Sequence, residues 1–330
     1  MLGRKEGCTA ADGTLEDQCR VISIVVTYNP DLALFRTVLD HLLQQVTGVL
    51  IVDNGSANNL ELKSLLAPIA APIEVIDLER NYGIAYALNS GISRALLQDP
   101  TWILTIDQDT ILHDGSIADV LRAHAQLDST VRYSCALVSL RDDGDRTTGG
   151  RADWLTSYCE RVNTLTDHGD FLEKRMVITS GNLIRPSVFG CVSFNSKLFI
   201  DQVDFDFCTS LRNKGFRILE YKPARMDHRV GGEVRILRTR RSYESGQRLY
   251  YIIRNGSYLA SRKRLPIRFF VAQTVIWCVA YVVANGWLSV FNCGVITLRA
   301  LIDGVLARLG QREIGVYSLR RWWAESRDAR

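Results

Sequence analysis

Two aspartates, Asp107 and Asp109, follow the apolar run WILTI at residues 102–106. If extended geometry continues through residue 109, both carboxylates point to the same side. Two like charges held together are costly unless a cation neutralises them. A hard divalent ion, Mg²⁺ or Mn²⁺, bridging these carboxylates and a diphosphate would do so. The alternative is an ordinary Asp-rich turn, and so short a motif leaves both interpretations open.

Polar segments also follow three other apolar runs. Thr27-Tyr28-Asn29 follows residues 21–26, Asp53-Asn54-Gly55-Ser56 follows 49–52, and Asn81-Tyr82-Gly83 follows 73–78. The turn at Asp53 is suited to hydrogen bonding with a base or ribose. Its structural alternative is a strand-to-helix turn with Ser56 as the helix N-cap.

Short apolar runs alternate with amphipathic stretches through the first half of the chain, and this alternation positions the polar segments. It predicts an α/β fold with a mostly parallel, doubly wound sheet. In such sheets ligands bind beyond the carboxyl ends of the strands. The predicted strands cover 21–27, 49–53, 73–78, 102–107, 176–184 and 216–220, and the predicted helices 34–43, 84–97, 115–127 and 204–214.

Four segments together resemble the family 2 glycosyltransferases of the GT-A fold, which is Rossmann-like. They are VVTYNPD (25–31), IVDNGS (51–56), RNYGIAYALNSGI (80–92) and LTIDQD (104–109). Within that family the chain is most similar to bacterial dTDP-rhamnosyltransferases of O-antigen and exopolysaccharide assembly, in order over most of residues 21–310. The resemblance implies an inverting glycosyltransferase that transfers L-rhamnose from dTDP-β-L-rhamnose. The acceptor would be a saccharide, free or carried on a polyprenyl diphosphate.

The resemblance also implies a donor site and a metal site. The metal, Mg²⁺ or Mn²⁺, would be bound by Asp107, Asp109 and His228, where imidazole is a competent ligand. The donor site would be formed by Thr27, Tyr28, Asn29, Asp53, Asn54, Asn81, Gly83, Ala85, Asn89, Asp107, Gln108 and Asp109.

Inverting transfer needs a general base, because the acceptor hydroxyl loses its proton as it attacks the anomeric carbon. Residues 198–218 resemble the family's acceptor-side region, and by position the base is Asp204, with Asp201 and Asp206 as alternatives. The structural interpretation makes Asp201 an N-cap and the other two first-turn residues that complement the helix dipole. The neighbouring segment Ser180-Gly181-Asn182 would contact the acceptor.

Residues 245–260, SGQRLYYIIRNGSYLA, also resemble the rhamnosyltransferase pattern, with Tyr250, Tyr251, Arg254 and Asn255 as matching positions. Helical spacing puts Tyr250 and Arg254 on one face, and arginine can bind phosphate bidentately. The prediction is contact with the diphosphate of a lipid-linked acceptor. The alternative is a basic helix lying on anionic lipid.

Charge is segregated along the chain. Residues 225–268 carry twelve Lys/Arg against three Asp/Glu, a net +9 in a chain of net +4, which predicts an anionic partner. The apolar stretch 265–291 follows. It is long enough to consider as a bilayer span, but its polar residues favour a helix in the membrane interface, or one packed on a partner subunit of a homo-oligomer.

Other classes of protein fit less well. Neither a dinucleotide fingerprint nor a P-loop motif occurs, and TYNPD lacks the glycines and basic residues of a nucleotidyltransferase phosphate loop. Eight scattered cysteines without a C-x-x-C pair indicate a reducing compartment. No signal-peptide pattern opens the sequence, so the prediction is a cytoplasmic protein, peripherally associated with the inner membrane. A basic segment beside an apolar one suits a membrane better than nucleic acid, which is not expected as a partner. A non-catalytic membrane scaffold and another UDP- or GDP-sugar transferase remain as alternatives.

The expected organisation has three parts. Residues 1–20 form a polar leader, and 21–240 a GT-A catalytic domain with a donor half (21–130) and an acceptor half (131–240). Residues 241–330 form a basic and apolar helical region. A Gly-, Asp- and Thr-rich stretch from 140 to 175 is predicted to be an irregular loop or lid.

Overall fold

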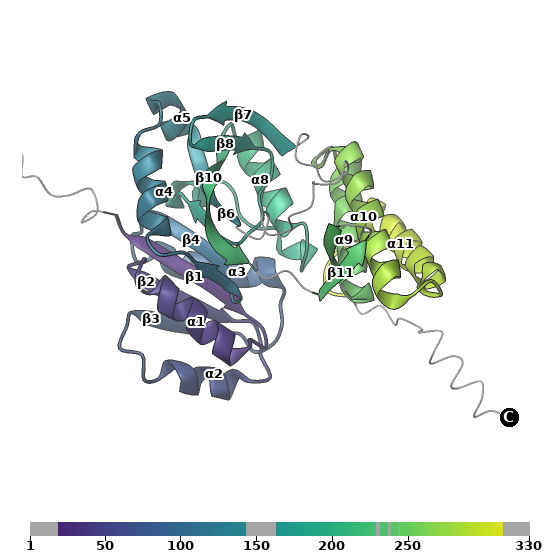
Figure 1. Ribbon diagram of the computed structural model, residues 1–330, viewed down its shortest axis with the longest axis horizontal. Helices are drawn as coiled ribbons and strands as arrows, with labels where there is room; N and C mark the ends of the chain where they lie inside the picture. Colours follow the sequence, from purple (N-terminus) through teal and green to yellow (C-terminus); the bar gives the residue numbers. More distant parts are fainter. Residues whose placement is uncertain (1–18, 143–162, 229–231, 237–238, 244, 313–330) are drawn as a thin grey trace, which may run out of the picture.

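The computed structural model describes residues 19–142, 163–228, 232–236, 239–243 and 245–312 (Figure 1). Most of the predicted leader and the 143–162 part of the predicted lid lie outside these residues. In the described part, an α/β core holds a large sheet, and a group of helices lies beside it (Figure 1).

Ten strands form one sheet in the order β3-β2-β1-β4-β9-β6-β10-β8-β7, and β5 pairs with β10. The four strands from β3 to β4 are parallel, as are β6 and β10, while β9 runs antiparallel between β4 and β6. The predicted α/β fold with a largely parallel sheet is confirmed. The strands are β1 (Val21–Thr27), β2 (Gly48–Asp53), β3 (Ile73–Asp77), β4 (Trp102–Asp107), β5 (Thr110–Leu112), β6 (Cys135–Asp142), β7 (Thr164–His168), β8 (Phe171–Lys174), β9 (Asn182–Ile184) and β10 (Arg217–His228).

Strand β1 is buried on both faces along its whole length. Because side chains alternate across a strand, Ile22 and Ile24 join one core cluster and Val21 and Val25 the other. Residues of α3 pack in the first cluster and residues of α1 in the second. The helices of the α/β core are α1 (Leu32–Leu42), α2 (Asn59–Leu66), α3 (Ile84–Leu96), α4 (Ser116–Ala125), α5 (Ser129–Ser134) and α8 (Val203–Asn213), with short 3-10 turns η1 (Pro186–Gly190) and η2 (Ser196–Leu198).

The prediction that residues 140–175 are irregular is wrong at both ends of that stretch. Strand β6 continues to Asp142, and β7 and β8 form an antiparallel hairpin. Gly169 has φ +73° in its turn, where its amide donates to the Asp167 carboxylate at 3.0 Å. Phe171 is buried against Tyr221 of β10. The hairpin therefore extends the sheet by two strands. Both strands are short, and the polar composition of the stretch hid their alternating buried and exposed side chains.

The C-terminal part is a helical group with one small hairpin. β11 (Gly232–Ile236) pairs with β12 (Thr239–Tyr243), and α9 (Gly246–Ser261), α10 (Ile267–Asn285) and α11 (Ser289–Val305) follow. The 265–291 stretch is not one helix, because Gly286 adopts φ +83° after α10 and a second helix begins three residues later. By length and composition α10 could cross a membrane, with mean hydropathy 1.8.

Part of the basic charge predicted to meet an external partner is neutralised inside the protein. Arg225 pairs with Asp119 at 3.0 Å, and Arg248 with Asp201 at 2.6 Å. Arg264 pairs with a carboxylate of α8 at 2.5 Å. The net charge of residues 225–268 thus overstates the charge that this segment presents to a partner.

Candidate active site

Asp53 ends β2, and its carboxylate is fully buried beneath the loops at the carboxyl ends of the strands. It accepts hydrogen bonds from the hydroxyls of Thr27 (2.9 Å) and Ser56 (2.5 Å), from the Ser56 amide (3.0 Å) and from the Asn59 side chain (2.8 Å). Burial acts to raise the pKa of Asp53, but the hydrogen bonds from Ser56, Asn59 and Thr27 outweigh it and hold the pKa below its ordinary value. The resemblance implied a contact with base or ribose. In the structure the ionised carboxylate holds the loops after β1 and β2 together through these hydrogen bonds.

The loop after β1 is fixed to the loop after β2. Asn29, with φ +47°, donates its backbone amide to the Ser56 hydroxyl at 2.8 Å, and its side-chain oxygen accepts from the Ala57 amide at 2.7 Å. Tyr28 is 48% exposed beside it. An exposed aromatic ring on a rigid polar loop is suited to stacking with a base.

The loop after β3 is fixed in the same way. The Asn54 side chain donates to the Asn81 side-chain oxygen at 3.0 Å and accepts from the Tyr82 amide at 2.9 Å. Gly83 has φ +90°, and a Cβ atom there would lie 2.5 Å from the carbonyl oxygen of Phe199. Only glycine therefore allows this loop to approach residue 199 so closely.

Two residues predicted for the sugar-donor site, Ala85 and Asn89, contact other parts of the protein instead. Ala85 is fully buried in the core on α3. The Asn89 side chain donates to the Phe194 carbonyl at 2.8 Å and accepts from the Phe194 amide at 3.1 Å. These side chains hold α3 against residues 194–198, and direct contact with the donor, as predicted, does not fit their positions.

Strand β4 ends at Asp107, and residues 108–109 form a turn, so extended geometry does not persist to Asp109. Both carboxylates keep partial exposure. The Asp107 backbone amide donates a hydrogen bond to the Ser180 hydroxyl at 2.9 Å. The Gln108 side chain accepts from the Tyr28 amide at 2.8 Å and donates to the Tyr28 carbonyl at 3.3 Å. This double contact continues the β1–β4 pairing beyond the strand ends and fixes the acidic turn to the donor loop.

His228 ends β10, where its backbone pairs with that of Thr110 in β5. That register brings residue 228 next to the acidic turn in the backbone, while its side chain lies outside the described part. Among the described residues, no group of three or more His, Cys, Asp or Glu side chains is arranged to hold a metal ion. Asp107 and Asp109 offer carboxylate oxygens, which are the ligands that a hard divalent cation prefers.

Asp204 lies in the first turn of α8 and keeps partial exposure. Burial raises its pKa to about 7, against the hydrogen bond from the Phe205 amide, and the nearby negative charges of Asp201 and Asp107 add to the rise. The charge of Asp107 in the donor-side acidic turn thus contributes to the raised pKa of this acceptor-side carboxyl. A carboxyl whose pKa lies near neutrality is suited to accept a proton at physiological pH.

The two alternative bases are engaged in ion pairs. Asp201 contacts Arg248 at 2.6 Å, and Asp206 contacts Arg264 at 2.5 Å. Asp201 also has φ +63°, which is not the geometry of the N-cap that the structural interpretation proposed. Among the three aspartates, the partners therefore favour Asp204 as the base.

The Ser180-Gly181-Asn182 segment lies beneath the acidic turn. The Ser180 hydroxyl is buried between the Asp107 amide and the Thr110 hydroxyl, which is 2.8 Å away. Gly181 has φ +78°, and Asn182 is buried and donates to the Ile178 carbonyl at 2.6 Å. This segment supports the turn from below, and the predicted acceptor contact does not fit its burial.

Tyr250 and Arg254 do share a helix face, as predicted, but that face is turned inward. Both side chains are fully buried, and Tyr251 is 2% exposed. The Tyr250 hydroxyl donates to Asp303 at 2.7 Å, and the Arg254 guanidinium donates to the carbonyl of Leu198 at 2.9 Å. The predicted contact with an acceptor diphosphate is therefore wrong for this arrangement, because these polar groups are used within the protein.

Sequence reasoning missed several residues that fix the site. Asn59 completes the hydrogen bonds to Asp53, Arg248 pairs with Asp201, and Gln202 donates to Gln273 of α10 at 2.9 Å. The last two contacts join residues 47 and 71 positions apart. No local spacing could have indicated them.

The largely parallel α/β sheet, with an acidic turn after β4, agrees with the GT-A fold predicted from the sequence. The family model described as "Glycosyl transferase family 2" matches residues 23–192, which is more than half of the chain. The chain belongs to the family 2 glycosyltransferases.

Individual proteins agree with this assignment. The chain is 26% identical to the "dTDP-rhamnosyl transferase RfbF" of Shigella flexneri over 267 residues, 77% of this chain and 84% of that protein. The structure of S. aureus TarS 1–349 in complex with UDP-GlcNAc matches with a TM-score of 0.53 at 15% identity, over 87% of this chain and 81% of that one. At this identity the likeness shows the fold alone. The chain spans 40% of the longer S. aureus TarS structure, with a TM-score of 0.43.

Proposed function

We propose that this glycosyltransferase inverts the anomeric centre as it transfers L-rhamnose from dTDP-β-L-rhamnose to a saccharide, free or carried on a polyprenyl diphosphate. The named activity of the 26% identical relative supports the sugar and the nucleotide. Residues 21–240 form the catalytic domain in this proposal, with a donor half and an acceptor half, and residues 241–330 the appendage. The product would serve cell-surface polysaccharide synthesis such as that of O-antigen.

The observation that carries the chemical proposal is Asp204 in the first turn of α8, a carboxyl whose pKa burial and the charges of Asp201 and Asp107 raise to about 7. Its ionised form takes the proton of the acceptor hydroxyl. The hydroxyl oxygen forms a bond to the anomeric carbon while the bond from that carbon to the diphosphate oxygen breaks. The electron pair leaves with dTDP, and a β donor gives an α-linked product.

The donor half holds the nucleotide in this proposal. The exposed Tyr28 stacks with the base, and the Asp53 network holds the loops around it. Asp107 and Asp109 fit a divalent cation, Mg²⁺ or Mn²⁺, with His228 as a third ligand next to them in the β10–β5 register. When bound, such an ion would neutralise charge on the departing diphosphate.

The test is mass spectrometry of products from dTDP-, UDP- and GDP-sugars, with free and lipid-linked acceptors, for the wild type and Asp204→Asn. We expect rhamnosyl transfer from dTDP-β-L-rhamnose by the wild type. The variant should bind donor normally and lose about 1,000-fold in turnover, the size typical for a general base. If the wild type turns over only another nucleotide sugar, the assignment of dTDP-β-L-rhamnose as donor fails. If Asp204→Asn is active, the assignment of Asp204 as base fails.

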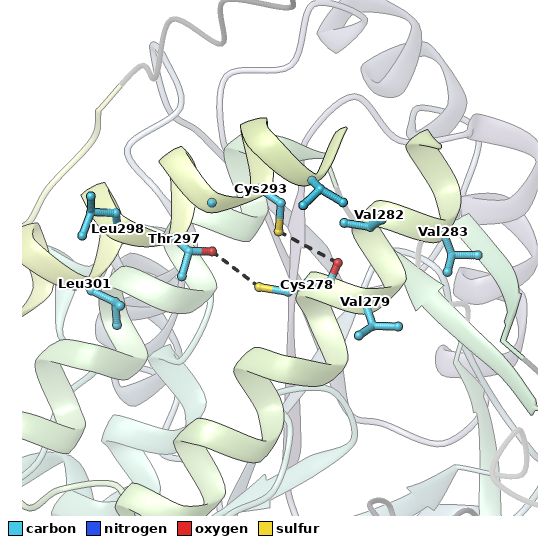
Figure 2. A pocket seen from close by; sticks show the side chains of 10 residues that line it. Cys278, Val279, Val282, Val283, Cys293, Thr297, Leu298 and Leu301 are labelled. Carbon is cyan, nitrogen blue, oxygen red and sulfur yellow. Dashed lines mark hydrogen bonds between the residues drawn. The ribbon is translucent and has the colours of Figure 1, made fainter. Parts of the chain in front are cut away.

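We further propose that α10 and α11 rest on the anionic inner membrane surface, which makes the enzyme cytoplasmic and peripheral. A groove of about 670 Å³ opens between these helices, and Figure 2 shows its lining of Val279, Val282, Val283, Leu298 and Leu301 around Cys278 and Cys293. Exposed apolar side chains continue along both helices; they include Ile267, Val271, Val275, Trp287, Leu288, Phe291, Val295 and Ile302. So large an apolar surface marks an interaction site.

Charge beside this surface favours an anionic membrane over a second copy of the chain. Arg299, Arg308 and Arg312 border an adjoining recess of about 400 Å³ that shares Leu298 with the groove. Among the described residues, all three arginines contact one buried carboxylate, that of Asp303, so positive charge is in excess there. Arginines at the edge of an apolar helix face are typical of helices that lie in the membrane interface.

Co-sedimentation with phosphatidylcholine vesicles, with and without phosphatidylglycerol, tests this association. Trp287→Ser with Phe291→Ser should release the protein, because these side chains are 78% and 68% exposed and so contribute little to folding. Leu97→Ser is the matched control, since Leu97 is 75% exposed but follows α3 in the α/β core. Binding that is unchanged by the double substitution, or a concentration-dependent dimer without vesicle binding, would overturn the proposal.

A further inference from the structure

The segment of residues 198–202 immediately precedes the helix that carries Asp204. Three of its residues that are not glycine adopt positive φ: Phe199 (+68°), Asp201 (+63°) and Gln202 (+61°). Such conformations persist only where the surroundings hold them in place, and they gather at functional sites. What holds this segment therefore also determines where Asp204 lies.

Helix α9 supplies most of the contacts that hold the segment. The Asn255 side-chain nitrogen lies 3.0, 2.8 and 2.8 Å from the carbonyl oxygens of Leu198, Ile200 and Asp201. The Arg254 guanidinium donates to Leu198 as well, at 2.9 Å. Both side chains are fully buried. The backbone carbonyls of the strained segment are thus satisfied by two side chains more than 50 residues away in sequence.

The remaining carbonyl of residues 198–201 connects to the donor side. Phe199 accepts a hydrogen bond from the Ile84 amide at 2.8 Å, at the start of α3, where Gly83 leaves room for it. The Phe199 ring packs against Tyr251 of α9, with ring centroids 5.4 Å apart. Residues 198–201 consequently touch the donor loop, the base-bearing helix and α9 together.

A purely structural role does not require this chemistry. Burying a guanidinium and an amide is costly, and apolar side chains of similar volume would hold two helices together without that cost. The Arg254 guanidinium donates hydrogen bonds to the carbonyls of Leu198 and Gly310 and to the side-chain oxygen of Asn255. Its guanidinium is thus committed to one conformation of the segment.

We propose that Asn255 and Arg254 are positioning residues for the transfer reaction: by holding the carbonyls of residues 198–201 they set the distance between Asp204 and the donor loop. The proposal rests on the assignment of Asp204 as base. It gives the C-terminal helices a part in catalysis that is separate from any contact with a membrane. Neither residue touches substrate in this role.

The experiment compares Asn255→Ala with Ser257→Ala. Ser257 is the matched control, because it lies on the same helix, is also buried, and donates to the Leu301 carbonyl of α11 at 3.1 Å, away from the segment. Steady-state kinetics are measured for both, with thermal unfolding as the check on folding. We expect Asn255→Ala to lower kcat by about 10- to 100-fold with donor KM changed less than about threefold, since displacement by about 1 Å costs that much. Ser257→Ala should keep kcat within about twofold.

Asn255→Ser, which replaces the amide donor by a shorter hydroxyl donor, takes the place of Asn255→Ala if the alanine variant fails to fold, and the same criterion applies. A variant that loses only thermal stability and keeps the wild-type kcat overturns the proposal. Asp204→Asn, measured alongside, separates the two inferences. If that variant keeps turnover, the base assignment fails. If it is inactive while the Asn255 variant has normal kcat, only the positioning role fails.

Discussion

Substitution of Asp204 by asparagine should stabilise the protein above neutral pH. The carboxyl has a pKa of about 7 in the folded state against 3.8 ordinarily, because burial and two neighbouring carboxylates disfavour its charge. A raised folded-state pKa means that the contribution of this group to stability is fully present below pH 3.8. It is lost as the pH rises toward 7. Asparagine carries no such charge, so it removes the loss.

The magnitude follows from the same two values. A rise from 3.8 to about 7 corresponds to about 4 kcal/mol at 1.36 kcal/mol for each tenfold change in proton affinity. Partial exposure of the side chain and screening reduce this figure, so we expect a gain of about 1–3 kcal/mol at pH 8. The gain should be absent near pH 3.5, grow between pH 4 and 7, and stay constant above pH 7.

Urea denaturation across this pH range, with a chelator present, measures the gain. The chelator matters because a cation at Asp107 would itself offset the repulsion. Asp206→Asn is the control: its carboxylate is 6% exposed and paired with Arg264 at 2.5 Å, so its loss should destabilise the protein by leaving the guanidinium unpaired. A gain from Asp204→Asn that is independent of pH, or a loss of stability at pH 8, would refute the reasoning.

Three further predictions concern the donor side. Gln108→Ala removes both hydrogen bonds to Tyr28. Because each bond contributes about 0.5–1.5 kcal/mol, we expect the dissociation constant of the dTDP-sugar, measured by calorimetry, to rise about tenfold. An unchanged constant contradicts this. Gly83→Ala combines φ +90° with a contact of 2.5 Å to Phe199 and should lower the free energy of unfolding by about 2–3 kcal/mol, whereas a loss below about 0.5 kcal/mol speaks against the close approach. Asp109→Ala should abolish the transfer that depends on Mn²⁺, and a wild-type response of transfer to added Mn²⁺ would place the metal at other residues.

The fold was predictable where local pattern decides it. A strand such as β1, apolar along its whole length, requires cover on both faces, and helical periodicity in 84–97 predicted α3. The β7–β8 hairpin was missed because its two strands are short and follow a stretch rich in Gly, Asp and Thr. Placement of β9 antiparallel between β4 and β6 depends on pairing that no local pattern expresses.

The site was predictable in position and less so in detail. Since the carboxyl ends of parallel strands converge, the residues after β1, β2 and β4 had to meet, and hydrogen bonds join Thr27 to Asp53 and Tyr28 to Gln108. Sequence could not indicate that Asp53 faces inward. Periodicity likewise showed that Tyr250 and Arg254 share a face, but it does not tell whether that face meets solvent or protein.

The acidic run 201–206 and the basic segment 225–268 are separate features in the sequence but contact each other in the structure. Three aspartates lie within six residues, and their residue type alone gives no reason for their partners to differ. Arginines from the segment 225–268 pair with two of them, Arg248 with Asp201 and Arg264 with Asp206. Within the described residues Asp204 has no such ion pair, and burial leaves it with a pKa of about 7. Ion pairs between residues 47 and 58 positions apart in sequence thus distinguish Asp204 from its two neighbours, and this difference supports the proposal that Asp204 is the base.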